Sequence, residues 1–271
     1  MPADLRRAKI LERIQRDGGA SIGDLARDHG VSPITVHRDL ERLAEEGLIE
    51  RVHGGARPPG GATRLRVPTD WAKRLRQALP EKEAIAACAA EFVEDGSTIF
   101  LDSSTTSLAL ARFLERHPPR ALTLVTNSPA IALELHAQPI QVVVTPGELD
   151  QTLRMIGGRW AAEFLAGLNM ETAFVSAGGI TLEHGLTTTR RALADALHAA
   201  TASSTRTIGL IDSSKFGVAA LLAIARAQDL DALVVDDGVP PDTVADYEAA
   251  GVNLVVAQRG DGASSSSSAT A

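Results

Sequence analysis

A cluster of small polar residues follows a short apolar run near residue 100, and these side chains could bind an anion. The run Thr98–Leu101 predicts a buried strand, and a helix through Leu114 is expected after the polar cluster. Side-chain hydroxyl and unpaired amide groups at a helix N-terminus suit a phosphate. One Ser or Thr would suffice as an N-cap, so four hydroxyl groups favour an anion site over a simple cap. The residues are Asp102, Ser103, Ser104, Thr105 and Thr106.

Polar residues after later apolar runs are predicted to join the same site. Glycine lets a backbone approach a ligand closely. A lysine pairs with a phosphate or sugar oxygen, and a carboxylate accepts sugar hydroxyl groups. A single lysine is more often a surface residue. The hypothesis of a shared ligand site therefore depends on the position of these residues after successive predicted strands. The further candidates for effector binding are Asn127, Gly147, Gly179, Thr187, Asp212 and Lys215.

Residues for catalysis or metal binding are not arranged in a recognisable pattern. The seven histidines are scattered, and the sequence has no Cys/His cluster at metal-ligand spacing. Sugar isomerisation needs a positioned base, usually a carboxylate, and the loop Ser176–Ile180 contains none. Glu183 and His184 follow in a predicted turn. Cys88 lies in an alanine-rich helical run and is interpreted as a core residue. We therefore expect no metal, no cofactor and binding without turnover.

Short apolar runs alternate with helical segments from Pro80 onward. This order is typical of βαβ units and predicts an α/β domain with a mostly parallel sheet. Ligands of such sheets bind beyond the carboxyl ends of the strands, where the polar candidates lie. The predicted strands are Thr98–Leu101, Leu122–Thr126, Ile140–Val144, Glu171–Val175, Thr207–Ile211, Leu233–Asp236 and Leu254–Val256. The predicted helices include Asp70–Leu79, with Trp71 as an anchor, Glu81–Phe92 and Ser128–Ala137.

The N-terminal segment predicts three short helices. The first is Arg6–Asp17, Ser21 caps the second, and the third is Ser32–Glu46. Pro33 suits the first turn of that third helix, because its missing N–H has no partner to lose there. Val36, Leu40 and Leu43 recur at helical spacing and predict one buried face. Taken alone, this pattern also fits an amphipathic helix in a solvated helical domain.

A predicted hairpin follows the third helix and favours a winged helix-turn-helix. Gly47 ends the helix, Leu48–Val52 alternates like a strand, and His53-Gly54-Gly55 forms a tight turn. The exposed side chains of such a helix and wing reach base edges and phosphates of DNA. The candidate DNA-binding residues are Ser32, Thr35, His37, Arg38, Arg42, Arg51 and His53.

The charges of the chain are divided unevenly between its two parts. Residues 1–78 contain 15 Lys and Arg against 11 Asp and Glu, whereas residues 79–271 contain 12 against 23, within a net charge of −7. An acidic second part would repel DNA, so we expect DNA to bind only the first part, with a strong salt dependence.

Both parts resemble the DeoR family of bacterial transcriptional regulators. The first part matches at Val31-Ser32, Thr35–Leu40, Leu43, Gly47, Arg51 and His53–Ala56, although His37 stands where the family usually has arginine. The second part is similar at Ile99–Thr106, Val125–Ser128, Gly147–Leu149, Gly185–Thr188 and Asp212–Gly217. The resemblance implies a cytoplasmic, oligomeric regulator, commonly a repressor of carbohydrate metabolism, that binds operator DNA and a phosphorylated sugar effector. It also implies a ribose-5-phosphate-isomerase-like effector domain, and this likeness makes a sugar-phosphate isomerase the alternative function.

Two positions depart from the family pattern in the second part. Gly178 stands where the family has aspartate, and Asp195 and Leu197 replace a Glu-x-Lys pattern. Arg190 or Arg191 is a candidate for the missing cation, and both also fit solvated arginines at a helix start.

The expected organisation has four segments. Residues 1–57 form the winged helix-turn-helix, 58–80 a linker, 81–257 the effector domain, and 258–271 a Gly, Ser and Ala tail without structure. No apolar run approaches the roughly 20 residues of a membrane span, and the start of the chain lacks the apolar core of a signal peptide. A mean hydropathy of +0.02 is typical of a soluble globular protein, and a single cysteine fits a reducing cytoplasm.

Overall fold

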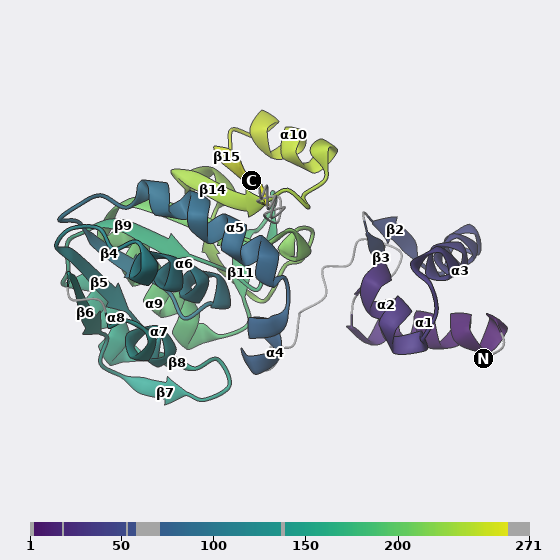
Figure 1. Cartoon of the computed structure of the whole chain (residues 1–271), viewed down its shortest axis with the longest axis horizontal. Helices are drawn as coiled ribbons and strands as arrows, with labels where there is room; N and C mark the ends of the chain where they lie inside the picture. The colour runs from purple at the N-terminus through teal and green to yellow at the C-terminus, as the bar shows by residue number, and fades with distance from the viewer. Residues whose placement is uncertain (1–2, 18, 53, 58–70, 137–138, 260–271) are drawn as a thin grey trace, which may run out of the picture. The chain divides into compact units, whose positions relative to one another are not determined.

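The computed structural model divides the chain into two compact units, Met1–Arg66 and Val67–Ala271. It describes residues 3–17, 19–52, 54–57, 71–136 and 139–259 (Figure 1). Most of the expected linker and the whole Gly, Ser and Ala tail beyond 259 lie outside these described residues.

Unit 1 contains three helices around a small apolar core. They are α1 (Ala3–Asp17), α2 (Ile22–His29) and α3 (Pro33–Glu45). The predicted caps are confirmed, because the side chain of Ser21 accepts a hydrogen bond from the Asp24 amide and that of Ser32 accepts one from the Thr35 amide. The fully buried side chains of the core include Ile10, Ile14, Leu25, Val36 and Leu40.

A three-stranded antiparallel sheet completes unit 1 and contains the predicted wing. Its strands are β1 (Ala20–Ser21), β2 (Glu50–Val52) and β3 (Gly55–Arg57), in the order β1-β3-β2. A Cβ atom on Gly55 would overlap the carbonyl oxygen of Ala20. Gly55 is therefore needed for the close pairing of β1 and β3, a strand pair that the sequence analysis did not predict.

The wing strand is shorter than the predicted Leu48–Val52. Gly47 has a φ of +70° and its amide donates to the Ala44 carbonyl, while the Leu48 amide donates to the Leu43 carbonyl at 2.9 Å. These bonds satisfy the last carbonyl groups of α3, as a C-terminal glycine does in many helices. Leu48 thus belongs to the helix end, and β2 starts at Glu50.

Unit 2 is built around a seven-stranded parallel sheet, as the sequence predicts. The strand order is β15-β14-β12-β9-β4-β5-β6. Each predicted strand is present, with shifts of at most a few residues at its ends. The strands are β4 (Thr98–Leu101), β5 (Leu122–Thr126), β6 (Ile140–Val144), β9 (Met170–Val175), β12 (Ser204–Ile211), β14 (Ala232–Asp236) and β15 (Leu254–Ala257).

Helices cover both faces of this sheet (Figure 1). One core lies between the sheet and four helices, α4 (Trp71–Arg76), α5 (Leu79–Ala89), α6 (Thr105–Arg116) and α7 (Pro129–Glu134). The other core involves α8 (Arg159–Ala166), α9 (Arg191–Ala202) and α10 (Pro241–Ala249). Within the described ranges, no helix has the length and apolar character needed to cross a bilayer.

Several segments that the sequence analysis treated as loops form short antiparallel strands. One sheet has the order β10-β11-β13, with β10 (Gly179–Thr181), β11 (Gly185–Thr188) and β13 (Leu222–Ala225). A hairpin pairs β7 (Glu148–Asp150) with β8 (Met155–Gly157). Such strands were missed because they are only three or four residues long, so they carry almost no periodic signal.

Two predicted helices are shorter in the structure. The segment predicted as Asp70–Leu79 is helical only as α4, because Ala78 adopts a φ of +50° and α5 starts anew at Leu79. The helix predicted as Ser128–Ala137 ends at Glu134. Beyond it, the His136 amide donates to the Glu115 carboxylate instead of to a carbonyl of its own helix.

Candidate nucleic-acid interface and effector site

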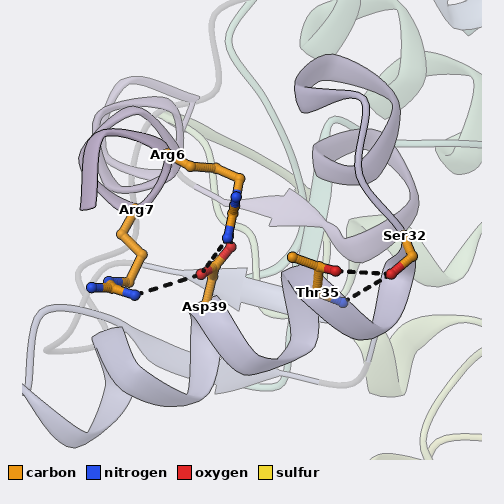
Figure 2. Close-up of polar contacts among 5 residues, drawn as sticks. All are labelled: Arg6, Arg7, Ser32, Thr35 and Asp39. Atoms are coloured by element: carbon orange, nitrogen blue, oxygen red, sulfur yellow. Dashed lines mark hydrogen bonds and ion pairs between the residues drawn. The ribbon is translucent and has the colours of Figure 1, made fainter. Parts of the chain in front are cut away.

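The start of α3 is held by a pair of hydroxyl side chains. The Ser32 Oγ accepts a hydrogen bond from the Thr35 amide at 3.3 Å and lies 2.9 Å from the Thr35 Oγ1 (Figure 2). Both hydroxyl groups therefore have partners within the helix cap. Ser32 and Thr35 stay candidates for DNA contact, and the structure also gives them a role in starting the helix.

His37 connects the third helix to the wing. The Arg51 guanidinium of β2 donates to the His37 carbonyl at 3.3 Å and lies 3.1 Å from His37 Nε2. Because a guanidinium only donates, Nε2 accepts and the proton of a neutral ring is on Nδ1, which lies 3.1 Å from Glu41 Oε1. Both ring nitrogens are thus occupied, and Arg51 is fixed at the base of the wing.

The two exposed arginines of α3 differ in their surroundings. Arg42, on the C-terminal half, lies 3.5 Å from the carboxylates of both Glu45 and Glu46. Arg38 is exposed on the N-terminal half, and no ion pair is found for it among the described residues. Arg38 is therefore the better placed of the two to reach a base. The predicted contact His53 lies outside the described residues.

A charged residue inside unit 1 was missed by the sequence analysis. Asp39 is 4% exposed and its carboxylate bonds the Arg6 guanidinium of α1 at 2.6 and 3.3 Å, with Arg7 3.8 Å away (Figure 2). The hydrogen bond to Asp39 is the largest cause of a raised pKa at Arg6. In the sequence, the feature that could have identified Asp39 as buried is its position beside Val36 and Leu40 on the predicted buried face of the helix.

The carboxyl ends of the parallel strands in unit 2 carry a row of buried polar residues. Two of the strands, β4 and β9, are neighbours from which the chain continues in opposite directions across the sheet. Such a switch point is where doubly wound sheets bind ligands. From β14 to β6 the row consists of Asp236, Asp212, Ser176, Asp102, Asn127 and Thr145.

Asp102 joins the two strands at this switch point. Its Oδ2 accepts a hydrogen bond from the Ser176 amide at 2.8 Å, while its Oδ1 accepts from the Ser107 hydroxyl and the Ser104 amide at 2.6 and 3.0 Å. Both carboxylate oxygens are therefore used to shape the loop before α6. The predicted cluster of hydroxyl residues thus lies at the N-terminus of α6, and Asp102 of the same cluster holds that N-terminus in position.

Asn127 lies at the strand end beside Asp102, Thr145 lies at the next strand end, and both have unused hydrogen-bonding capacity. Leu101 pairs with Thr126 across β4 and β5, so Asp102 and Asn127 follow at adjacent strand ends. The Asn127 side chain is 0% exposed, and neither its amide oxygen nor its amide nitrogen has a partner among the described residues. The buried Thr145 Oγ1 is likewise unpaired in this part of the chain. Buried polar groups normally have partners, so these atoms favour a bound polar group here.

Asp212 and Lys215 lie on the other side of the switch point. Asp212 caps a short helical turn, Ser213–Lys215, by accepting from the Ser214 amide, and Lys215 is half-buried. Lys82 of α5 was missed by the sequence analysis, although it continues the buried face of Ile85 and Ala89.

Lys82 is 3% exposed and donates hydrogen bonds to the carbonyls of Arg74 and Gln77 at the end of α4, at 2.6 and 2.5 Å. Burial lowers the pKa of its amine, while the nearby Asp212 carboxylate opposes that effect.

Three other candidates are used within the protein itself. A Cβ atom on Gly147 would overlap the Gly157 carbonyl oxygen, and one on Gly179 would overlap that of Val218. The Thr187 Oγ1 donates to the Gly179 carbonyl at 3.1 Å and accepts from the Ala220 amide at 2.8 Å. Backbone packing thus accounts for these residue types without a ligand.

The two arginines before α9 are clearly distinguished by the structure. Arg191 is exposed and pairs with Asp195 one turn later, at 2.9 Å. Arg190 lies 3.8 Å from Asp150 of β7, and its buried Nε has no hydrogen-bond partner among the described residues. Arg190 is the better candidate for a missing cation. In the same ranges, no three His, Cys, Asp or Glu side chains gather as metal ligands.

Comparison with known families covers both units. The DeoR-like helix-turn-helix domain matches residues 6–59, and the DeoR C terminal sensor domain matches residues 77–237. The second match alone includes more than half of the chain.

Curated relatives agree with these matches. The chain is 31% identical over 257 residues to the HTH-type transcriptional regulator GlpR of Haloferax volcanii, covering 94% of this chain and 98% of the relative. It is 32% identical to the Glycerol-3-phosphate regulon repressor of Escherichia coli, covering 87% and 91%. A solved ribose 5-phosphate isomerase from Methanocaldococcus jannaschii is 17% identical, covers 52% of this chain and 55% of that chain, and has a TM-score of 0.39. That likeness carries no argument about activity. The chain belongs to the DeoR family of transcriptional regulators.

Proposed function

We propose that this chain is a cytoplasmic repressor of a carbohydrate operon, that α3 and its wing bind the operator, and that unit 2 binds a phosphorylated sugar. The main observation that supports effector binding is that the ordered helix N-terminus at Asp102–Thr106 lies next to Asn127. The side chain of Asn127 is buried and has no hydrogen-bond partner among the described residues. Relatives named as a glycerol-3-phosphate regulon repressor and a putative aga operon repressor support the carbohydrate assignment.

The DNA-binding half rests on the exposed face of α3. Arg38 reaches outward from the N-terminal half of the helix, which is the part that contacts base edges in helix-turn-helix proteins. Arg51 lies at the base of the wing, where it contacts the DNA backbone. A homodimer of such modules binds two half-sites separated by whole helical turns, about 10 bp each.

In the effector half, the phosphate lies at the N-terminus of α6. The first amides of a helix have no partner within it and carry a partial positive charge. Lys215, which follows β12, and Arg190, which follows β11, are the cationic residues that we propose for this phosphate. Asn127 and Thr145 accept hydrogen bonds from sugar hydroxyl groups or donate hydrogen bonds to them, which gives their unpaired polar atoms a partner.

A thermal-shift experiment on the full chain tests the effector half. Glycerol 3-phosphate, glucose 6-phosphate and ribose 5-phosphate are each compared with glycerol, glucose and ribose. We expect one phosphorylated compound to raise the Tm by several degrees, as binding to the folded state requires, and its unphosphorylated partner to have no effect. Asn127→Ala should remove the shift, whereas Arg191→Ala should keep it. Consumption of the compound would instead support the isomerase alternative.

A further inference from the structure

Ile34 is an apolar residue on the outward face of α3. It is the second residue of the helix and 68% exposed. The buried face is formed by Val36, Leu40 and Leu43, and at 100° per residue Ile34 points away from its centre. A β-branched residue is a slightly poor helix former, so neither packing nor helix propensity explains an isoleucine at this position.

The polar side chains near Ile34 are already occupied within the protein. Thr35 bonds Ser32, and the two ring nitrogens of His37 face Glu41 and Arg51. Arg38 follows Ile34 by four residues and is exposed on the same face. The N-terminal half of α3 therefore offers DNA one cation and one branched apolar group, side by side.

A single exposed apolar residue is common on protein surfaces, so the inference rests on where Ile34 lies. In the major groove, the C5-methyl of thymine is the apolar group that a base pair presents, and apolar side chains contact it. We propose that Ile34 contacts a thymine methyl group in each half-site and so selects T·A at that position. The proposal rests on the DNA-binding function proposed above.

The spacing of the two outward side chains limits where that thymine lies. Side chains four residues apart on a helix are about 5–6 Å apart, and base pairs stack about 3.4 Å apart. The thymine contacted by Ile34 therefore lies within two base pairs of the base that Arg38 reads.

The experiment starts from duplexes selected by the full chain from a random library. Each thymine of the selected half-site is then replaced singly by deoxyuridine, which removes only the methyl group. We expect one position at which deoxyuridine weakens binding of the wild type about threefold to fivefold per half-site, the effect of about one buried methyl group. Ile34→Ala should bind thymine and deoxyuridine equally at that position, and Ile34→Val should keep part of the difference.

Leu5→Ala is the matched control, because Leu5 is 51% exposed on α1 and should leave the thymine preference unchanged. Equal sensitivity of the wild type and Ile34→Ala to deoxyuridine at every position would overturn the inference, as would a selected half-site without thymine. If no sequence is enriched at all, the proposed DNA-binding function fails as well, and the two failures are thus distinguishable.

Discussion

The guanidinium of Arg6 and the carboxylate of Asp39 form a two-point contact, with Nε donating to Oδ2 at 2.6 Å and Nη2 to Oδ1 at 3.3 Å. This pair fixes α1 against α3 inside unit 1, because Asp39 is almost completely buried. Removing one partner of a buried pair leaves the other charge without compensation, which is strongly destabilising.

Asp39→Asn should therefore loosen α1 and α3 without affecting unit 2. We expect faster amide exchange in both helices of the full chain and a Tm of unit 1 lower by roughly 5 °C or more. Hydrogen exchange followed by mass spectrometry separates the two units. Glu45→Gln, which removes an exposed partner of Arg42, is the control, and equal exchange in both variants would contradict the structural role of Asp39.

Arg38 and Arg42 should differ in their effect on operator binding. A bidentate contact of an arginine to a base is worth about 1–3 kcal/mol, so Arg38→Ala should weaken binding about tenfold to a hundredfold and relax the sequence preference at one position. Arg42→Ala, which loses only an arginine already paired with two glutamates, should weaken binding less and equally for all sequences. Fluorescence anisotropy with specific and scrambled duplexes measures both. An equal loss in the two variants would remove Arg38 from base reading.

Lys82 should hold the first helix of unit 2 in place. Its two bonds to carbonyl groups at the end of α4, together with Arg154 stacked 4.5 Å over the Trp71 ring, fasten that helix to the core. In a Trp160→Phe background, Trp71 is the sole tryptophan, and Lys82→Met should increase its quenching by acrylamide. Lys73→Met on the exposed side of α4 is the control and should leave the quenching unchanged.

The stability of the chain should also depend on pH through Lys82. Burial lowers its pKa in the folded state below 10.5, the value of an unperturbed lysine. Between the folded pKa and 10.5 the unfolded chain holds one more proton, so the free energy of unfolding rises with pH over that window. Urea unfolding at several alkaline pH values should show a more positive slope in the wild type than in Lys82→Met, because the raised pKa values of Cys88 and Tyr247 act in the opposite direction in both proteins. The same slope in Lys82→Met would assign it to another group.

Cys88 should react slowly with alkylating reagents. Burial raises the pKa of its thiol, and the negative charge of Glu91 acts in the same direction. Since the thiolate is the reactive form, we expect alkylation by iodoacetamide at pH 8 to be at least about tenfold slower in the folded chain than in urea. Mass spectrometry follows the reaction, and similar rates in the two states would contradict this burial.

Local signals in the sequence predicted the main elements of both units. Ser21 and Ser32 have side chains that cap their own helices, and the apolar strand runs are continuous, so neighbouring residues suffice to identify them. The hairpin of β7 and β8 depends instead on pairing between Glu148 and Gly157, in which no periodic run takes part. Such elements form only because the surrounding fold brings their strands together.

The sequence likewise predicted only those parts of the candidate sites that depend on neighbouring residues. Residue type and order identified Asp102, Asn127 and Asp212 at strand ends but not Ser176, Thr145 and Asp236. The partners that join Asp102 to β9 and Asp39 to α1 lie 74 and 33 residues away in the chain. Sequence spacing therefore could not show that Asp102 is used to join two strands. It also could not show that Lys82 is buried and lies close enough to Asp212 for that carboxylate to raise its pKa.

The junction made by Asp102 has a consequence for how this regulator responds. One of the three hydrogen bonds of Asp102 links the α6 loop to the end of β9, and the other two lie within the loop and the first turn of α6, so the protein itself holds this loop in place. If a phosphorylated sugar binds at this loop, as proposed, the ordered loop favours its affinity and leaves little local movement for it to cause. A response of the DNA-binding unit would then need movement elsewhere in unit 2. Along the chain, α4 is the helix of unit 2 that follows the DNA-binding unit, and it is held by the buried Trp71, by the Lys82 amine and by Arg154 over the Trp71 ring.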